Sequence, residues 1–313
     1  MLKDFLTSNT CFKLVCGAGN EDIEEVKKLV YIYSKAGCKF FDLSANLDII
    51  KTTKQALELA HSKEHYLCVS VGIKDDPHVN KAVIDKTKCF ECDHCIDICP
   101  QNAVSITNEV NEVRCVGCGK CKRECPASAI SFVSREKDLK EVLPPIIKEG
   151  IDCIEFHAFG LDETETKSKW AYINSVFSGI LSICTSRGKL SDENMIARIK
   201  NMLQGRESYS TIIQADGFPM SGSEDGFKTT LQAVATAQLV SRENLEVFLI
   251  LSGGTNTKTS SLAKMCELNY NGIAVGSFAR KIVKKYTTDN DFWNNIELQE
   301  EAIAVAKNLV DSI

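Results

Sequence analysis

Eight of the chain's 15 cysteines lie in one short stretch and repeat a single spacing. The first motif reads C-x2-C-x2-C-x3-C-P and consists of Cys89, Cys92, Cys95 and Cys99, followed by Pro100. The second motif has the same spacing and consists of Cys115, Cys118, Cys121 and Cys125, followed by Pro126. Thiolates at this spacing are typical ligands of [4Fe–4S] clusters, so the stretch predicts single-electron chemistry.

The spacing also predicts which thiolates share a cluster. Three cysteines two residues apart wrap one corner of a cube, whereas the fourth lies a helical turn later and reaches the other cube. We therefore expect cluster 1 at Cys89, Cys92, Cys95 and Cys125. We expect cluster 2 at Cys115, Cys118, Cys121 and Cys99. A pair of structural zinc sites is the alternative, but zinc needs neither the third cysteine of each motif nor the proline after the fourth.

The charges around the two motifs differ in sign. Acidic residues surround the first motif, at Glu91, Asp93 and Asp97, and basic residues surround the second, at Lys120, Lys122 and Arg123. Negative charge near a cluster opposes its reduction and positive charge favours it. We therefore predict the higher reduction potential for cluster 2; the alternative is that these side chains form an ordinary solvated surface.

The composition is that of a globular protein from a reducing compartment. Of 313 residues, 44% are hydrophobic and 25% charged, which excludes a wholly disordered chain. No run of about 18 apolar residues occurs, and the first residues lack the pattern of a secretory signal. The net charge of −5 gives no bulk attraction to nucleic acid. We expect a cytoplasmic protein whose other cysteines, such as Cys68 and Cys184, are small buried residues.

Outside the cysteine motifs, short β-type runs alternate with amphipathic helices. We expect strands at 12–16, 38–44, 66–71, 152–157, 180–185, 211–215, 247–251 and 272–275, each followed by a helix. Eight such units favour an α/β fold of the (β/α)8 TIM type, with an open doubly wound sheet as the alternative. The predicted division is 1–84 for strands one to three, 85–133 for a ferredoxin-type 2[4Fe–4S] insert, and 134–313 for the rest of the barrel.

The strand ends carry the second set of residues that could do chemistry. The insert follows the third strand, so we expect it beside or over the barrel mouth, where barrel sites form. Alternation along the strands brings polar residues to this mouth, namely Lys13, Asp42, Ser44, Glu155, His157, Gln214 and Asp216. They predict a pocket, the alternative being polar barrel residues without a function.

Glycines after the last two strands suggest a phosphate site. Gly253 and Gly254 follow the seventh strand, and Gly276 and Ser277 follow the eighth. Loops at these places often bind phosphate through backbone amides and a helix N-terminus. FMN or another phosphate-bearing ligand is therefore a candidate, because flavin exchanges one electron with a cluster and two with a substrate. Two tight turns without a ligand are the alternative.

Taken together, these segments resemble the light-dependent-period (LdpA) family of cyanobacteria. The resemblance rests on the opening segment 12–18, the doubled cysteine motif, the segment Asp216-Gly217-Phe218-Pro219-Met220-Ser221-Gly222, Ser252-Gly253-Gly254-Thr255-Asn256 and Val275-Gly276-Ser277-Phe278-Ala279-Arg280. It covers nearly the whole chain. The cysteine motif is shared with all bacterial-type ferredoxins, so the segments around Asp216 and Gly253 carry the specificity for the family.

The resemblance implies an iron–sulfur redox sensor of the circadian clock input. Its expected partners are clock-input kinases and oscillator proteins, together with an electron donor or acceptor that is a protein or a quinone. The eight cluster cysteines carry over individually, whereas no catalytic residue does. The alternative function is a ferredoxin-linked oxidoreductase with a flavin or a small substrate in the barrel mouth.

Overall fold

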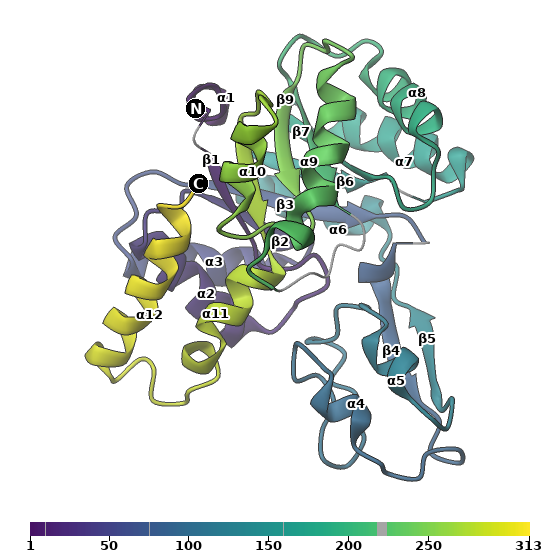
Figure 1. Cartoon of the computed structure of the whole chain (residues 1–313), viewed down its shortest axis with the longest axis vertical. Helices are drawn as coiled ribbons and strands as arrows, with labels where there is room; N and C mark the ends of the chain where they lie inside the picture. Colours follow the sequence, from purple (N-terminus) through teal and green to yellow (C-terminus); the bar gives the residue numbers. More distant parts are fainter. Residues whose placement is uncertain (10, 75, 159, 218–223) are drawn as a thin grey trace.

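The computed structural model describes residues 1–9, 11–74, 76–158, 160–217 and 224–313. Eight parallel strands close into a barrel in the order β1-β10-β9-β8-β7-β6-β3-β2 (Figure 1). The strands are β1 Cys11–Val15, β2 Phe40–Ser44, β3 Tyr66–Gly72, β6 Cys153–His157, β7 Ile180–Ser186, β8 Thr211–Asp216, β9 Phe248–Ser252 and β10 Gly272–Val275. The predicted TIM-type barrel is thus confirmed, and the open doubly wound sheet is wrong.

Helices cover the outside of the barrel. They are α2 Ile23–Lys35, α3 Leu47–Leu59, α6 Leu139–Glu149, α7 Glu163–Val176, α8 Asp192–Leu203, α9 Phe227–Ser241, α10 Thr259–Met265, α11 Ser277–Thr287 and α12 Ile296–Val310. Several begin at a side chain that accepts a hydrogen bond from the first turn, as Asp22 does from the Glu25 amide and Ser191 from the Asn194 amide. These caps determine the residue at which each helix begins.

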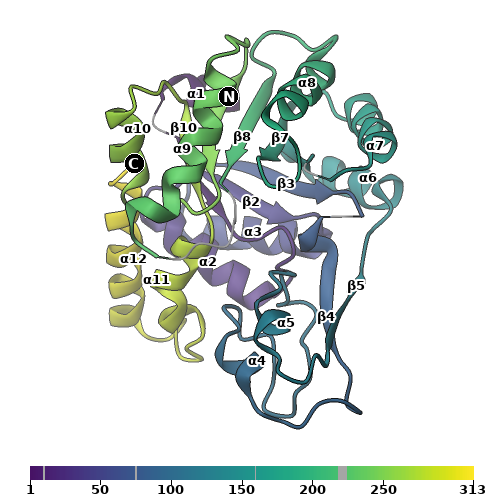
Figure 2. The same cartoon turned by 45° about the vertical axis from the view of Figure 1, so that its right-hand side comes forward.

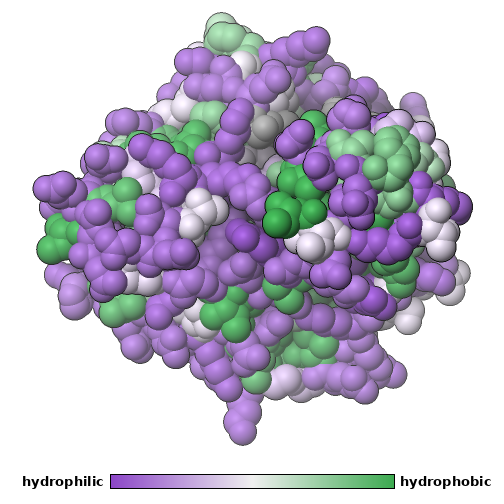
Figure 3. All heavy atoms as spheres, turned by 90° about the horizontal axis from the view of Figure 1, so that it is seen from below, coloured by the Kyte–Doolittle hydropathy of each residue, from purple (hydrophilic) through white to green (hydrophobic). Residues whose placement is uncertain are grey.

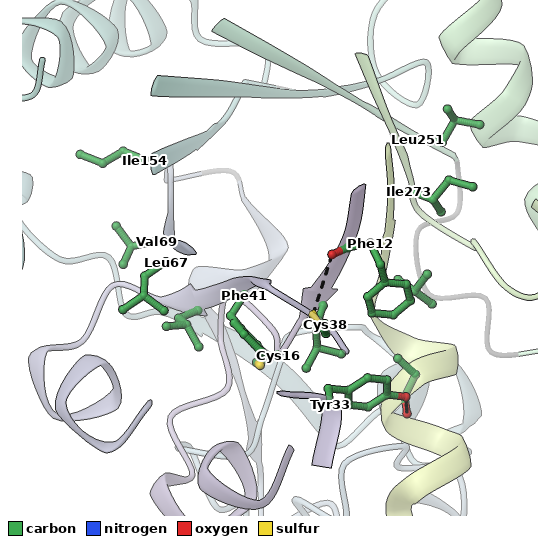
Figure 4. Packing of buried hydrophobic residues seen from close by; sticks show 14 of the residues in the cluster. Phe12, Cys16, Tyr33, Cys38, Phe41, Leu67, Val69, Ile154, Leu251 and Ile273 are labelled. Atoms are coloured by element: carbon green, nitrogen blue, oxygen red, sulfur yellow. Dashed lines mark hydrogen bonds between the residues drawn. The ribbon is translucent and has the colours of Figure 1, made fainter. Parts of the chain in front are cut away.

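The main hydrophobic core lies between the barrel and these helices. Outward-facing strand residues such as Phe12, Phe41 and Ile154 pack there against helix residues such as Tyr33 (Figure 4). The thiol of Cys38 donates to the Phe12 carbonyl oxygen at 3.8 Å in the same layer. Because alternate strand residues point outward into this layer, the remaining ones point into the barrel.

The barrel interior is apolar at one end and polar at the other. Inward residues near the strand starts, including Phe40 and Phe248, form an apolar cluster with Leu2 and Leu6 of the short helix α1 Leu2–Thr7. Helix α1 therefore closes the N-terminal end of the barrel, opposite the insert (Figures 1 and 2). Further along the strands the inward residues are polar, and the candidate site lies there.

The insert leaves after β3 and returns into α6. It contains the 3₁₀ turn η1 Pro77–Val79, strands β4 Asn80–Ile84 and β5 Ile130–Ser134, which pair antiparallel, and helices α4 His94–Asp97 and α5 Lys120–Glu124. It contacts the loop after β1, where the Glu21 amide donates to the Val113 carbonyl oxygen at 2.7 Å. The insert thus lies at the C-terminal face of the barrel, as predicted. Strand β4 belongs to the insert although it precedes the expected limit at residue 85; the division into domains otherwise stays a prediction.

Three helices differ from the expected pattern. Sequence patterns alone predict a helix after the 152–157 strand that begins near residue 168, but helix α7 begins at Glu163, because the Asp162 side chain caps it by accepting from the Glu165 amide. The helix after the 247–251 strand is expected to run to residue 268, but α10 ends at Met265, since Glu267 adopts a left-handed φ of 53°. Helix α1 was not expected, because six residues show no clear helical period. Residues 218–222 of the family-specific segment that begins at Asp216 lie outside the described residues.

Candidate functional site

The eight motif cysteines gather around two separate cavities in the insert. One cavity is lined by Cys89, Cys92, Cys95 and Cys125. The other is lined by Cys99, Cys115, Cys118 and Cys121. The fourth cysteine of each motif therefore lies with the first three cysteines of the other motif. These are the two sets that the spacing predicts; their role as cluster ligands stays a prediction.

The local backbone turns the sulfur atoms toward amides. The Ala103 amide donates to Cys99 Sγ at 3.3 Å, and the Ala129 amide donates to Cys125 Sγ at the same distance. The repeated Cys-Pro-x-x-Ala order thus places one amide on each fourth cysteine. In the second motif Gly117 packs so closely that a Cβ there would lie 1.8 Å from the Pro77 carbonyl oxygen. No side chain fits at this position.

Both cavities suit an iron–sulfur cube. Each offers four thiols, and the first also has apolar walls at Ile84 and Ile130. Burial, together with the neighbouring thiols of Cys118, Cys115 and Cys99, raises the pKa of Cys121 to about 11. Burial likewise raises the pKa of Cys95. Thiolates crowded in this way are stabilised by a bound cation, which makes metal binding and thiol deprotonation one linked event.

The second cysteine set faces the barrel. Lys81 Nζ donates to the Cys115 carbonyl oxygen at 2.6 Å and to the Gly19 carbonyl oxygen, in the loop after β1, at 2.8 Å. Lys284 of α11 donates to the Pro100 carbonyl oxygen at 3.1 Å, next to Cys99. Two cations therefore lie between the second set and the barrel, in addition to the basic residues of its own loop.

Inside the barrel, Lys13 holds several predicted pocket residues together. Its ammonium lies 2.6 Å from Glu155 Oε2, 2.9 Å from Asp42 Oδ2 and 2.8 Å from Gln214 Oε1. Glu155 also accepts from Ser182 at 2.9 Å, and Asp42 accepts from Ser70 at 2.6 Å. These side chains come from β1, β2, β3, β6, β7 and β8, and Lys13 has no exposed surface.

Burial and charge act against each other in this network. Burial alone would raise the pKa of Glu155, but Lys13 and His157 lower it to about 2. Burial alone would lower the pKa of Lys13, and its carboxylate neighbours, Asp42 first, hold it well above the usual value. The pKa of Asp42 is raised, because burial outweighs the attraction of Lys13. The network thus keeps an ammonium and a carboxylate together out of water.

His157 extends the network toward the insert. Its Nδ1 lies 2.6 Å from Asp76 Oδ2, and its Nε2 lies 3.5 Å from Glu155 Oε1. The other oxygen of Asp76 lies 2.8 Å from His78 Nδ1. Burial alone would lower the pKa of His157, but Asp76 and Glu155 raise it well above the usual value. A chain of polar contacts therefore runs from the insert to Lys13.

Sequence reasoning missed Asp76 and His78. Both follow β3, and Asp76 caps the turn η1 by accepting from the His78 amide at 2.9 Å. The Asp-Pro-His order was the available signal, since an Asp before Pro marks the start of a helical turn. Of the predicted pocket residues, Ser44 is buried at the end of β2, and Asp216 is buried at the end of β8. Burial raises the pKa of Asp216 to about 6, with Glu155 adding to the effect.

The predicted phosphate loops are closely packed. A Cβ at Gly253 would lie 2.6 Å from the Gly217 nitrogen, and one at Gly254 would lie 2.4 Å from the Thr229 carbonyl oxygen. Gly276 precedes Ser277, the first residue of α11. Close backbone packing is a sufficient reason for the glycines at 253 and 254, so the phosphate site stays a prediction.

A cavity of about 230 Å³ lies at the junction of the barrel and the insert, and we call it the junction cavity. On the barrel side it reaches Ser70 and Asp76. On the insert side it is lined by residues that include Lys81 and Glu112. It lies at the C-terminal ends of β2 and β3, on the face where ligands of such barrels bind.

Known proteins place the chain in one family. The family profile described as "Light dependent period A C-terminal domain" matches residues 145–312. A protein named "Light dependent period A" from Synechococcus elongatus is 30% identical over 286 residues, which is 86% of this chain and 80% of that protein. The chain belongs to the light-dependent-period A family. The family resemblance of the sequence is thereby confirmed.

Two further similarities concern the cysteine-rich insert and the barrel of this family member. A 4Fe-4S binding domain profile matches residues 109–131, which contain the second cysteine motif, so the protein is an iron–sulfur member of the family. The YdjI aldolase from Escherichia coli K12 superposes with a TM-score of 0.51 at 8% identity, covering 98% of this chain and 92% of that one. This likeness shows the barrel fold alone. Within the described residues, the helices are too short or too polar to cross a membrane.

Proposed function

We propose that this protein is a redox sensor carrying two [4Fe–4S] clusters. Cluster 1 is held by Cys89, Cys92, Cys95 and Cys125, and cluster 2 by Cys115, Cys118, Cys121 and Cys99. The observation that carries the proposal is the exchange of the fourth cysteine between the two motifs. Such an exchange, with a third cysteine at the x2 spacing in each motif, is typical of two-cluster ferredoxins.

The position of the second cysteine set supports a signal from cluster to barrel. Lys81 and Lys284 tie this set to the loop after β1 and to α11. Each electron that cluster 2 gains adds one negative charge beside these cations. The free energy of this interaction changes by an amount on the order of 1–3 kcal/mol, which corresponds to about a 5–150-fold change in an affinity. The barrel surface is thus the part that reports the redox state.

We propose that the readers of this state are clock-input kinases and oscillator proteins in the cytoplasm, and that the signal is photosynthetic redox state. The insert end of the molecule is mainly hydrophilic, with small separate hydrophobic patches (Figure 3). A surface of this kind supports a transient contact rather than a permanent one. The electron donor or acceptor is a protein or a quinone.

The experiment is partner capture with protein in two redox states. Anaerobically purified protein is immobilised after oxidation or after reduction with dithionite, and clock-input kinase is passed over it. We expect binding to differ about 5-fold or more between the states. Cys118→Ser, which removes a ligand of cluster 2, should abolish the difference, whereas Cys266→Ala, on the barrel, should keep it. Equal binding in both states would contradict the proposed sensor function but not the assignment of the clusters.

A second candidate is an oxidoreductase, favoured by the buried network around Lys13 and by the junction cavity next to cluster 2. Electrons would pass from the clusters to a flavin or to a small substrate at the barrel mouth. Its test is the absorbance of the protein after the clusters are extracted. A remaining flavin band would support a flavoenzyme, and a colourless barrel would contradict it.

A further inference from the structure

The junction cavity has apolar walls and a polar inner end. Val71, Val79, Leu139 and Val142 provide apolar surface, and His78 and Lys81 provide polar surface. Pockets with this combination bind small molecules, because the apolar walls hold the body of the ligand and a few polar groups orient it. Neither the cysteine motifs nor the Lys13 network accounts for this space.

The charged groups around the cavity are almost all paired. Arg135 lies 2.7 Å from Glu112, and Lys137 is paired with Glu21. Glu136 is paired with Lys169. These pairs neutralise three carboxylates and their cations, so they leave no net charge to attract a ligand.

Lys81 differs from these groups. It is 7% exposed, and its ammonium donates to two backbone carbonyl oxygens, those of Gly19 and Cys115. An ammonium has three protons, so one remains for a ligand. A buried cation held by carbonyl oxygens alone gains more from a carboxylate than from water. The charge that this cavity lacks is therefore a single negative one.

We propose that the junction cavity binds a small organic carboxylate, with the carboxylate at Lys81 and an apolar body against Val71, Val79 and Val142. The ligand then touches the barrel and the insert at once. Lys81 also contacts the peptide of Cys115, so the ligand places a negative charge close to cluster 2. This last step rests on the proposed function: ligand binding disfavours cluster reduction, and reduction in turn weakens ligand binding by the same factor.

The test is calorimetric titration of the oxidised, anaerobically purified protein with benzoate, with pyruvate as a second carboxylate. Benzamide is the neutral match for benzoate. We expect benzoate to bind at least about 10-fold more tightly than benzamide, because only the carboxylate forms a charged hydrogen bond. Lys81→Met should remove this preference. Lys137→Met, on the same cavity but paired with Glu21, should keep it.

A substitution that fills the cavity tests whether benzoate binds there or elsewhere on the protein. Val142→Trp in α6 occupies the cavity from the barrel side, away from the cysteines, and should abolish benzoate binding while the iron content stays unchanged. No binding of benzoate or pyruvate to the unmodified protein would overturn the proposal, and so would equal binding of benzoate and benzamide. Iron content is measured separately, so a failure here is distinct from a failure of the cluster assignment.

Discussion

At the scale of single residues, Lys13 is the group on which the barrel interior depends. It is the cation that Glu155 and Asp42 share, at 2.6 Å and 2.9 Å, and it has no exposed surface. Lys13→Met should lower the free energy of unfolding at pH 7 by about 3–5 kcal/mol, because it leaves buried carboxylates without a partner. Denaturant unfolding measures this loss. The double variant Lys13→Met/Glu155→Gln should recover part of it; no recovery would contradict the charge argument.

Asp216 gives a pH dependence with a definite sign. Its pKa is about 6 in the folded protein against a usual value of 3.8, with burial as the main cause. The folded state therefore binds more protons between these values, and stability falls as the pH rises from about 4 to about 6. Asp216→Asn should remove this fall, which amounts to 2–3 kcal/mol at the order-of-magnitude level. Unfolding measured across this range tests it, with Glu300→Gln on the exposed side of α12 as the control.

At the scale of elements, helix α1 closes the end of the barrel opposite the insert. Leu6 has no exposed surface and packs in the inner cluster with Phe40 and Phe248. Leu6→Ala should cost about 2–5 kcal/mol of unfolding free energy, because the strands around it cannot collapse into the space. Leu59→Ala, at the half-exposed end of α3, should change stability by less than about 0.5 kcal/mol. Similar effects of both substitutions would mean that α1 does not plug the barrel.

Helix α11 brings a cation to the second cysteine set. Lys284 lies at the Pro100 carbonyl oxygen and the Asn102 side chain, at 3.1 Å and 2.8 Å. Lys284→Met should lower the midpoint potential of cluster 2 and leave that of cluster 1 unchanged, because a cation is removed from one cluster only. Redox titration followed by low-temperature spin resonance measures both. Lys285→Met removes a neighbouring charge that is paired with Glu301 on the surface, and it should change neither potential.

The elements also show how far the sequence alone leads. Strand-and-helix alternation was sufficient for the barrel, because each of its eight strands is a short β-type run followed by a segment with a helical period. Alternation along the strands placed Lys13, Asp42, Glu155 and Gln214 on one inner surface. It could not show that the Lys13 ammonium contacts the other three side chains, since those contacts depend on the register between strands distant in sequence.

Other parts of the candidate site could not be predicted from sequence patterns. Asp76 and His78 sit in a loop, where no period marks an inward side chain, and only the fold brings them to His157. The junction cavity likewise lies between the barrel and the insert, so the sequence of neither part alone predicts its shape. The cysteine sets are the opposite case, because thiol spacing within one short stretch is a local property.

At the scale of the whole molecule, a closed barrel carries the cysteine-rich insert on one face. Its N-terminal end is sealed by α1, and its C-terminal end meets the insert through Lys81, Glu21 and Lys284. Lys81 and Lys284 join the second cysteine set to the barrel, so we propose that a signal from cluster 2 reaches the barrel through these contacts. This arrangement favours a sensor whose surface responds to an electron in the insert.

The iron and sulfide content of anaerobically purified protein, with its cysteine variants, tests the central claim most directly. The account predicts about eight iron and eight sulfide per chain. Cys92→Ser and Cys118→Ser should each lose about half of the iron, one through cluster 1 and the other through cluster 2, while Cys184→Ala retains all of it. Protein that contains zinc or no metal, or variants that keep the full iron content, would contradict the account.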